Sequence, residues 1–495
     1  MELSANARIV GVTLVSAMGF FLFGLGQGYI GGVLISPSFK RDVGHLPGWR
    51  NSDTRLDAGI SGLIVGMLPL GCILACLPPA TSFFADSLGR KVSIEIGAVV
   101  FILGTAIQAT SSSEGHMCLG MLITGLAIGI LSTVCPLYLA EVAPADKRGA
   151  LTSVCQIVLI VGIIVGSGLD LAFQGVDNGW RFGLSIQLIP AVLLALGAFF
   201  IPESPRLLVR KGDEDKAIRV LLAIRQERTD AESELKQIMS DHASATCSGQ
   251  ARWTDMFTGR SGKLLALGSA LHVLQQVQGI NSVVYFGPRL FESLNLLSAN
   301  SFETIANTVL LLGTLPAPLL VDRCGRRKLL LWSSVGQALP SLLIGILGVT
   351  TMDKVGNAWV SESGAAGWAI VALVCVFYAN FAYGWGPVAW VYCAEMFPLR
   401  SRSKCVGFTT MTDWMGVFLV AQLSPLLFDF ADFGAFFFFA AFSFLALAVS
   451  WWLPETKGVP LEEIDQLFDA KFGAASEAKA STMAPECDVE ATART

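Results

Sequence analysis

One charged motif, Tyr-x-Ala-Glu-x-x-Pro-x-x-x-Arg, occurs twice in this chain. In each copy, a glutamate and an arginine are spaced so that they can act together. The first copy contains Glu141 and Arg148, and the second contains Glu395 and Arg402. Each glutamate ends a long apolar segment and an arginine follows within two turns, so the spacing predicts charge pairs at one face of a membrane. Such pairs form and break as a protein changes shape, which is conformational rather than covalent chemistry. Two copies half a chain apart predict two equivalent halves.

Two shorter motifs repeat in the same order. Residues 86–90 (Asp-Ser-Leu-Gly-Arg) match residues 322–326 (Asp-Arg-Cys-Gly-Arg), and residues 202–204 match residues 454–456. We expect charge-assisted bonds between the bundles at the inner ends of neighbouring helices, present in the outward-open state and broken when the inner side opens. The alternative is that these are solvated charges that only set topology. The predicted conformational gate comprises Asp86, Arg90, Glu141, Arg148, Asp322, Arg326, Glu395 and Arg402.

Long apolar segments must position these motifs. Of the 495 residues, 53% are hydrophobic and only 15% are charged, whereas soluble domains average about 25% charged residues. A helix needs about 20 residues to cross a hydrocarbon core of about 30 Å. The sequence therefore predicts an all-α membrane protein with twelve transmembrane helices in two six-helix pseudo-repeats. The predicted segments are about 9–34, 57–80, 92–110, 116–140, 150–172, 183–202, 264–287, 303–321, 328–350, 367–393, 404–428 and 434–453.

Basic residues predict the orientation of these helices. They gather in the connections that follow the even-numbered segments, as at Arg90, Lys147 and Arg326, with loop 35–56 as the exception. The positive-inside rule then places both termini in the cytoplasm. The plasma membrane is the default expectation for the membrane involved.

Charge and composition divide the chain into four parts. Residues 1–202 are predicted to form a six-helix bundle and residues 263–453 a second one. Between them, residues 203–262 are hydrophilic with apolar spacing typical of short cytoplasmic helices. Residues 454–495 form a cytoplasmic tail, which we expect to be disordered from about residue 470 because it has little apolar content.

The motifs resemble those of the sugar porters of the major facilitator superfamily, over essentially the whole chain to about residue 468. The string at 136–149 is similar to that family's fourth-helix signature, and 202–206 and 454–458 resemble its end-of-half signatures. Residues 275–285 look like its seventh-helix sugar-binding motif, and residues 28–39 resemble fungal hexose transporters. The resemblance implies the major facilitator fold and transport of a monosaccharide by alternating access, with no cofactor.

Intramembrane amides and an aromatic residue are the candidate substrate ligands. A sugar has many hydroxyls and one weakly apolar ring face, so its site needs amide donors and acceptors and an aromatic platform. Other amides will only join helices. Gly279 can loosen its helix, and glycine and proline at 384–387 predict a broken tenth helix. The resemblance implies that the substrate-binding residues are Gln156, Gln275, Gln276, Asn281, Asn307 and Trp390.

Two positions depart from the family's proton-coupled members, which carry an aspartate in the first helix and an arginine in the fourth. Gly26 and Met121 occupy those positions here, and neither can exchange a proton or tune a carboxylate. The departure favours facilitated diffusion. The alternative is proton symport through another acid, and Asp413, in an otherwise apolar segment, is the candidate.

Other classes are less favoured by the sequence. The altered site keeps open a carrier of a non-sugar polyol, acid or secondary metabolite, and a nutrient sensor is disfavoured by the short tail. No nucleophile–base set, phosphate loop or metal-ligand spacing is evident, which argues against an enzyme or a metal site. The expected partners are a small sugar and the lipid bilayer, without nucleic acid, and the expected working unit is a monomer.

Overall fold

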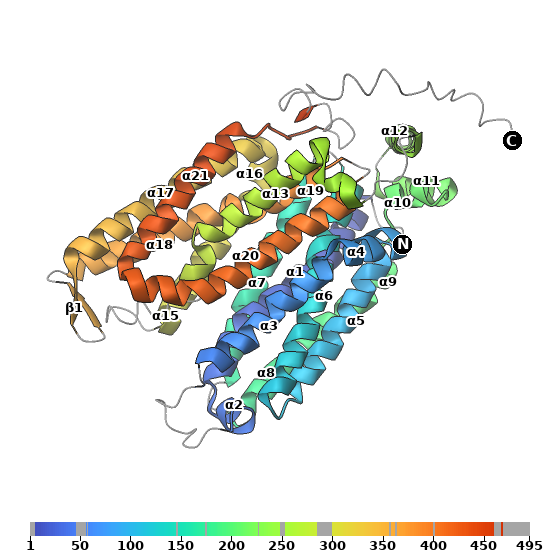
Figure 1. Cartoon of the computed structure of the whole chain (residues 1–495). Helices are drawn as coiled ribbons and strands as arrows, with labels where there is room; N and C mark the ends of the chain where they lie inside the picture. The colour runs from blue at the N-terminus through green and yellow to red at the C-terminus, as the bar shows by residue number, and fades with distance from the viewer. Residues whose placement is uncertain are drawn as a thin grey trace, which may run out of the picture.

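The structure is a computed structural model that describes residues 5–45, 56, 58–144, 147–173, 176–225, 227–247, 253–284, 299–355, 358–361, 364–398, 401–459 and 467–468. Two helical bundles lie side by side along a common axis (Figure 1). One contains the first half of the chain and the other the second half. Apart from one short hairpin, all regular elements of the described residues are helices, as the sequence predicted.

The first bundle contains the long helices of the first half. They are α1 (Ala5–Ile35), α3 (Ala58–Cys76), α5 (Arg90–Ala109), α6 (Glu114–Val142), α7 (Arg148–Phe173), and α8 (Gly179–Ile186) followed directly by α9 (Leu188–Phe200). Short elements connect them: α2 (Pro37–Asp42), α4 (Pro78–Thr81) and the π-helix η1 (Ser82–Leu88). The predicted segments coincide with these helices to within about four residues at each end, and the second segment continues past α3 into α4.

The second bundle follows the same order with more interruptions. Its helices are α13 (Gly259–Val277), α15 (Ala299–Thr314), α16 (Ala317–Cys324), α17 (Arg326–Thr351), α18 (Gly364–Tyr383), α19 (Trp385–Glu395), α20 (Arg402–Ala431) and α21 (Ala435–Trp452), with η3 (Asp432–Gly434) before α21. One antiparallel hairpin, β1 (Met352–Val355) with β2 (Ala358–Ser361), joins α17 to α18. The sequence predicted only a connection there.

Most of these helices are suited to a bilayer. Among the described residues, nine helices are long and apolar enough to cross a membrane, or ten if the bent pair around residues 315–316 is one span. The remaining predicted segments, 264–287 and 404–428, correspond to α13 and α20, which do not pass that test. Residues 285–287 of the first of these lie outside the described residues. Both helices carry buried polar side chains, which form the site described below.

Close helix packing explains the glycines of the first bundle. A Cβ added to Gly24 or Gly28 of α1 would overlap the backbone of Leu159 or Ile163 of α7. At Gly125 of α6, an added Cβ would meet the backbone of α3 in the same way. Small residues at such crossings let helix backbones approach closely in a membrane, where there is no hydrophobic drive between helices.

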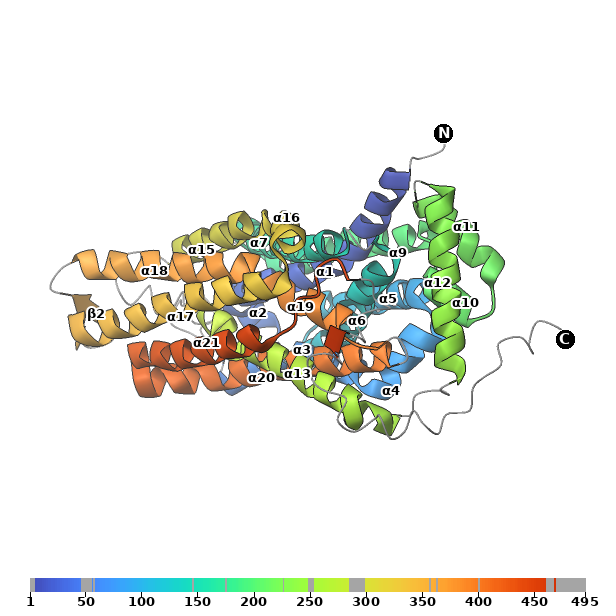
Figure 2. The same cartoon turned by 90° about the horizontal axis from the view of Figure 1, so that it is seen from above.

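The linker joins the bundles at one end of the molecule, which we call the linker end. Its elements are α10 (Pro205–Arg210), α11 (Glu214–Ile224), α12 (Arg228–Cys247) and the 3-10 helix η2 (Trp253–Phe257). In Figures 1 and 2, α10, α11 and α12 lie beside the start of α1, and the hairpin lies at the opposite end. Figure 1 shows α2 away from the linker as well. Arg225 fastens the linker to the first bundle, because it pairs with Glu234 at 2.6 Å and donates to the Val142 carbonyl at the end of α6.

Candidate functional site

The charged motif of the first half forms a buried cluster at the linker end. Arg90, at the start of α5, pairs through Nη2 with Glu141 Oε1 at 2.8 Å, and both side chains are buried. Its Nη1 lies 3.8 Å from Asp86 Oδ1. Glu203, just after α9, accepts the backbone N–H of Arg90 at 3.1 Å. This N–H begins a helix and has no partner within it, so the carboxylate satisfies it and complements the helix dipole.

The second half repeats the arrangement. Arg326, at the start of α17, binds both carboxylate oxygens of Glu395, at 2.8 and 3.2 Å. Its Nη1 donates to Asp322 Oδ1 at 3.1 Å. Glu455, just after α21, accepts the backbone N–H groups of Arg326 and Arg327 at 2.8 and 3.1 Å. The duplication predicted from the sequence is thus repeated in side-chain geometry.

The tyrosines of the repeated motif have matching roles. Tyr138 donates its hydroxyl to the Pro202 carbonyl at 2.5 Å, and Tyr392 donates to the Pro454 carbonyl at 3.0 Å. Each bond ties the motif helix to the chain that leaves the last helix of the same half. The tyrosine therefore stabilises its own bundle rather than a contact between bundles.

The two aspartates reach across to the other half. Asp86 Oδ2 accepts the Ser403 hydroxyl, at the start of α20, at 2.5 Å. Asp322 Oδ2 accepts the backbone N–H of Ala150, at the start of α7, at 2.8 Å. These reciprocal bonds join the halves at the linker end. We call them the crossing bonds.

The charge of Asp86 is held in place by its neighbours. Burial acts to raise the pKa of this carboxyl, but the charges of Arg210 and Arg90 and the Ser403 hydroxyl outweigh it. The pKa of Asp86 is therefore lowered below its ordinary value. Arg210 itself donates to Asp86 Oδ1 at 2.9 Å.

Two predicted gate residues have other surroundings. Arg402 Nε donates to the Phe397 carbonyl at 3.1 Å, whereas Glu395 is bound by Arg326. The side chain of Arg148 lies outside the described residues. Sequence analysis did not assign Glu203 and Glu455 to the gate set, although the repeated Pro-Glu-Ser/Thr motif singled them out.

A second cluster of buried polar side chains lies deep in the second bundle, between α13 and α20. Asp413 Oδ1 is 2.7 Å from Gln276 Nε2 and 3.2 Å from His272 Nδ1. Gln276 in turn accepts the Asn281 amide at 2.5 Å. His272, Gln276 and Asp413 are each less than 5% exposed. We call these four residues the polar chain. Sequence analysis missed His272, although it precedes Gln276 by one helical turn and so shares its face.

Gly279 gives the polar chain its shape. Helix α13 ends at Val277, and Gly279 has a φ of +98°, which favours glycine because it has no Cβ. The helix resumes at Ile280, so Gln276 and Asn281 face each other across a break in the backbone. The loosening predicted at this glycine is observed.

Gln275 and Gln156 both lie near Gly386, beside a second break. Helices α18 and α19 are separated at Gly384, as the glycine and proline content predicted. Gln275 donates to the Gly386 carbonyl at 3.4 Å, and a Cβ added to Gly386 would lie 3.6 Å from Gln156 Nε2. Gln156 belongs to the first half and the others to the second. Gln275 Oε1 is buried without a hydrogen-bond partner among the described residues.

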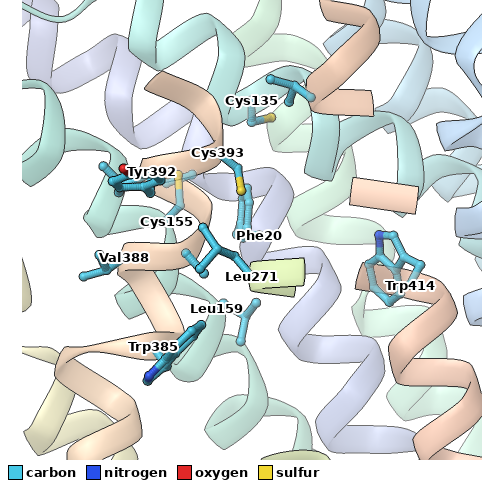
Figure 3. Close-up of a cluster of buried hydrophobic side chains, with 14 of the residues drawn as sticks. Phe20, Cys135, Cys155, Leu159, Leu271, Trp385, Val388, Tyr392, Cys393 and Trp414 are labelled. Atoms are coloured by element: carbon cyan, nitrogen blue, oxygen red, sulfur yellow. The ribbon is translucent and has the colours of Figure 1, made fainter. Parts of the chain in front are cut away.

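Aromatic residues border the polar chain. The ring of Trp390 meets those of His272 and Phe20 edge-on, with centroids 5.1 and 6.0 Å apart. Trp414 of α20 donates to Ser132 of α6 in the first half at 3.2 Å. Figure 3 shows Phe20 and Leu159 of the first half beside α19, with Trp414 on the far side of α1. Asn307 is buried on α15, but among the described residues no hydrogen bond joins it to the other candidate ligands.

The two positions that depart from the family pattern differ in their surroundings. A Cβ at Gly26 would meet only the end of Leu68, at 4.0 Å. Met121 is buried in a cluster that includes Tyr29, Ile64 and Trp180.

A family profile, sequence relatives and solved structures all relate the chain to transporters. The profile of the family described as "Sugar (and other) transporter" matches residues 12–468. The chain is 32% identical to the major facilitator-type transporter ecdD of Aspergillus rugulosus, covering 91% of this chain and 86% of that one. It is 30% identical to the glucose transporter GlcP of Staphylococcus epidermidis, covering 94% and 98%. Among solved structures, the proton:xylose symporter XylE bound to 6-bromo-6-deoxy-D-glucose is similar, with a TM-score of 0.79, 25% identity and coverage of 93% and 99%.

Proposed function

The chain belongs to the sugar (and other) transporter family of the major facilitator superfamily, and from that premise we propose that it carries a monosaccharide across a membrane by alternating access. The observation that carries the proposal is that Gln156, from one half, and Gln275, from the other, both lie near Gly386, beside a broken helix. A solute bound there contacts both halves, so their relative movement can expose it to either side in turn. GlcP, a relative over nearly its whole length, is named a glucose transporter.

The chemistry of the proposed site suits sugar hydroxyls. The buried Gln275 Oε1 needs a hydrogen-bond donor, and a hydroxyl supplies one. Gln276 and Asn281 can both donate and accept, which matches the dual character of a hydroxyl. Trp390 offers an apolar ring face next to these amides, and Asn307 contributes a further amide from α15.

The crossing bonds are proposed to close one side of the carrier. They join opposite halves, whereas the Arg90–Glu141 and Arg326–Glu395 pairs lie within a half. Opening the linker end would therefore break the crossing bonds and leave the pairs within each half intact. The basic residues at this end support its assignment to the cytoplasmic side, with both termini there and the plasma membrane as the site of action.

We propose that the sugar is transported by facilitated diffusion, without coupling to protons. Its support is that Gly26 and Met121, which cannot exchange a proton, stand where the proton-coupled members of the family carry an aspartate and an arginine, and that Met121 lies in a hydrophobic cluster. Proton symport is the second candidate, and one observation favours it. Asp413, an ionisable group within the helices, is buried and bound by two candidate-site residues.

Uptake in cells that lack hexose carriers tests the function. We expect labelled glucose, fructose or xylose to enter faster than in empty-vector cells, and Gln275→Ala to reduce the rate. Glu232→Gln, on an exposed helix of the linker, is the matched control and should transport normally. Absence of uptake of all three sugars, with protein verified in the membrane, would overturn the sugar assignment. A polyol, an organic acid or a secondary metabolite would then be tested.

A protonophore distinguishes facilitated diffusion from proton symport. Under facilitated diffusion, the sugar equilibrates across the membrane and the protonophore has no effect on the final level. Accumulation above the outside concentration that collapses with the protonophore would establish symport.

A further inference from the structure

His272 and Asp413 form an acid–base contact inside the polar chain. The imidazole Nδ1 is 3.2 Å from Asp413 Oδ1, and the two side chains are 1% and 5% exposed. His272 comes from α13 and Asp413 from α20, so the contact joins two different helices. It lies against Trp390 on one side and Gln276 on the other. The contact is thus continuous with the residues proposed to bind the sugar.

Charge balance distinguishes two states of this pair. With Nδ1–H donating to an ionised Asp413, the second ring nitrogen, Nε2, either carries a proton or does not. The pair is neutral overall when Nε2 is protonated, and it carries one negative charge when it is not. A net charge buried among helices is much less favourable than a neutral hydrogen-bonded pair. One proton on Nε2 therefore makes burial of the pair favourable.

The titratable groups next to the His272–Asp413 pair do not readily donate the proton that His272 Nε2 carries. Among the described residues, the titratable groups of packed helices that interact electrostatically with the pair are thiols: Cys72 and Cys76 of α3 with Asp413, and Cys393 of α19 with His272. A thiol is neutral when protonated, and burial in apolar surroundings disfavours its thiolate. The histidine is the group of this cluster whose ordinary titration falls between about pH 5 and pH 8.

We propose that His272 and Asp413 are a proton-binding pair built into the substrate site, and that proton binding and sugar binding are linked there. The proposal rests on the proposed function, since it assigns the residues that would couple protons to that same site. It differs from the coupling pair of the family's proton-driven members, whose positions are Gly26 and Met121 here. The proton is held on Nε2 of His272, and Asp413 orients and stabilises the imidazolium that results.

Gln276 connects the pair to the sugar. Its amide is engaged at both ends, because Nε2 donates to Asp413 and Oε1 accepts from Asn281. Each end keeps a second hydrogen-bonding position, but a sugar hydroxyl that takes the N–H now directed at Asp413 must displace that bond. When His272 is an imidazolium, its charge-assisted bond satisfies the Asp413 carboxylate more strongly. Gln276 Nε2 is then released to donate to the sugar, so the protonated pair is the form that binds it.

Linkage makes the proposal measurable in both directions. If protonation of the pair raises sugar affinity, sugar binding must raise proton affinity by the same factor. Above the pH at which the pair loses its proton, affinity should fall by up to about tenfold per pH unit. Linkage at both faces of the membrane would produce symport, and linkage at one face would make facilitated diffusion pH-dependent.

The test uses the full-length protein in lipid nanodiscs. Binding of glucose, fructose and xylose is measured by calorimetry across about pH 5 to 8, in buffers of different ionisation enthalpy, which gives the protons taken up per sugar. We expect uptake of a proton in the wild type at the alkaline end. His272→Gln retains a donor but cannot hold the charge, so it should bind with an affinity that changes less than about twofold over this range. His116→Gln, which changes a histidine of α6 away from the site, is the control and should behave as the wild type.

A second readout does not depend on the sugar. Because the imidazole ring lies 5.1 Å from Trp390, its protonation should quench tryptophan fluorescence in the absence of sugar. The quenching should disappear in both His272→Gln and Trp390→Phe. Sugar binding with no proton uptake, or an unchanged pH dependence in His272→Gln, would overturn the pair and leave the sugar carrier standing. Quenching that titrates normally, with none of the three sugars bound at any pH, would support proton binding by the pair and overturn the sugar assignment.

Discussion

The crossing bond from Asp322 to Ala150 allows the gate to be tested directly. Asp322 makes two bonds, one to the Ala150 N–H of the other half and one to Arg326 of its own half. The bond to Arg326 lies within one bundle, so we expect it to survive in both conformations. We expect only the bond to Ala150 to be lost on opening, and only an interaction that differs between two states can shift their equilibrium. The perturbation is Asp322→Ala, with Asp322→Asn as a graded variant.

The expected magnitude follows from the type of bond. A hydrogen bond to an ionised acceptor contributes about 1.5–3 kcal/mol, and each 1.4 kcal/mol or so corresponds to a factor of about ten in an equilibrium constant. Asp322→Ala should therefore raise the fraction open at the linker end by about 10- to 100-fold. Asp322→Asn retains a neutral acceptor and should raise it by about 3- to 10-fold.

Hydrogen–deuterium exchange of the protein in nanodiscs measures this opening. The amide of Ala150 is a poor reporter, because it loses its own acceptor in the variant. A better reporter is the stretch from α4 through η1, residues 78–88, which packs against α20 near the other crossing bond. Opening of the linker end should speed exchange there in proportion to the open fraction. Glu232→Gln is the control, since its exposed ion pair with Arg228 lies on the linker.

The outcome can refute the reasoning. Faster exchange at Ala150 alone, with residues 78–88 unchanged, would mean that the bond only caps α7 and is not part of a gate. The crossing bonds are at separate sites, so Asp86→Ala combined with Asp322→Ala should give roughly additive free energies. A double variant no more open than either single variant would mean that the bonds do not hold the same movement.

Three further predictions address the site and the packing. Gln276→Ala removes a neutral hydrogen-bonding group from the proposed sugar site and should raise KM for uptake by about 2- to 10-fold, with the folded yield retained. Gly24→Val should destabilise the first bundle by about 1–3 kcal/mol, because its side chain would overlap the Leu159 backbone, and the measurement is Tm in detergent. The lowered pKa of Asp86 means that its bonds are fully present above the ordinary carboxyl range and are lost only as pH falls through the lowered value. Asp86→Asn should therefore leave the shape of the uptake profile between about pH 5 and 8 unchanged.

The helices of this protein could be predicted because the bilayer imposes one length on them. Ten of the predicted segments coincide with helices suited to a membrane, counting the bent pair as one. The breaks at Gly279 and Gly384 were also predictable, since glycine and proline interrupt helices for local reasons. The hairpin β1–β2 was not predicted, because its strands are only four residues long and carry little periodic signal.

The partners of the charged residues were harder to predict, because they depend on tertiary distances. Asp322 binds a backbone N–H group, and no side-chain type identifies such a partner in a sequence. Asp86 binds Ser403, and nothing in the sequence distinguishes this serine from the others. His272 is a single histidine in an apolar helix, and its contact with Asp413 spans two helices that are distant in sequence. In the charged clusters, the repeated motifs identified the important positions. The polar chain belongs to one half and is not repeated, so the same signal did not identify it.

The carboxylates that follow the last helix of each half have a consequence for biosynthesis. Glu203 caps the start of α5 and Glu455 caps the start of α17. During translation from the N-terminus, the first cap becomes available before the second half is made. The second arrives only after α21, when nearly all of the chain has been synthesised. Two bundles of the same design therefore mature unequally, and the first amides of α17 must remain bonded to water until the carboxylate of Glu455 replaces it. Nascent chains that stall before residue 455 should be the form that membrane quality control recognises and degrades.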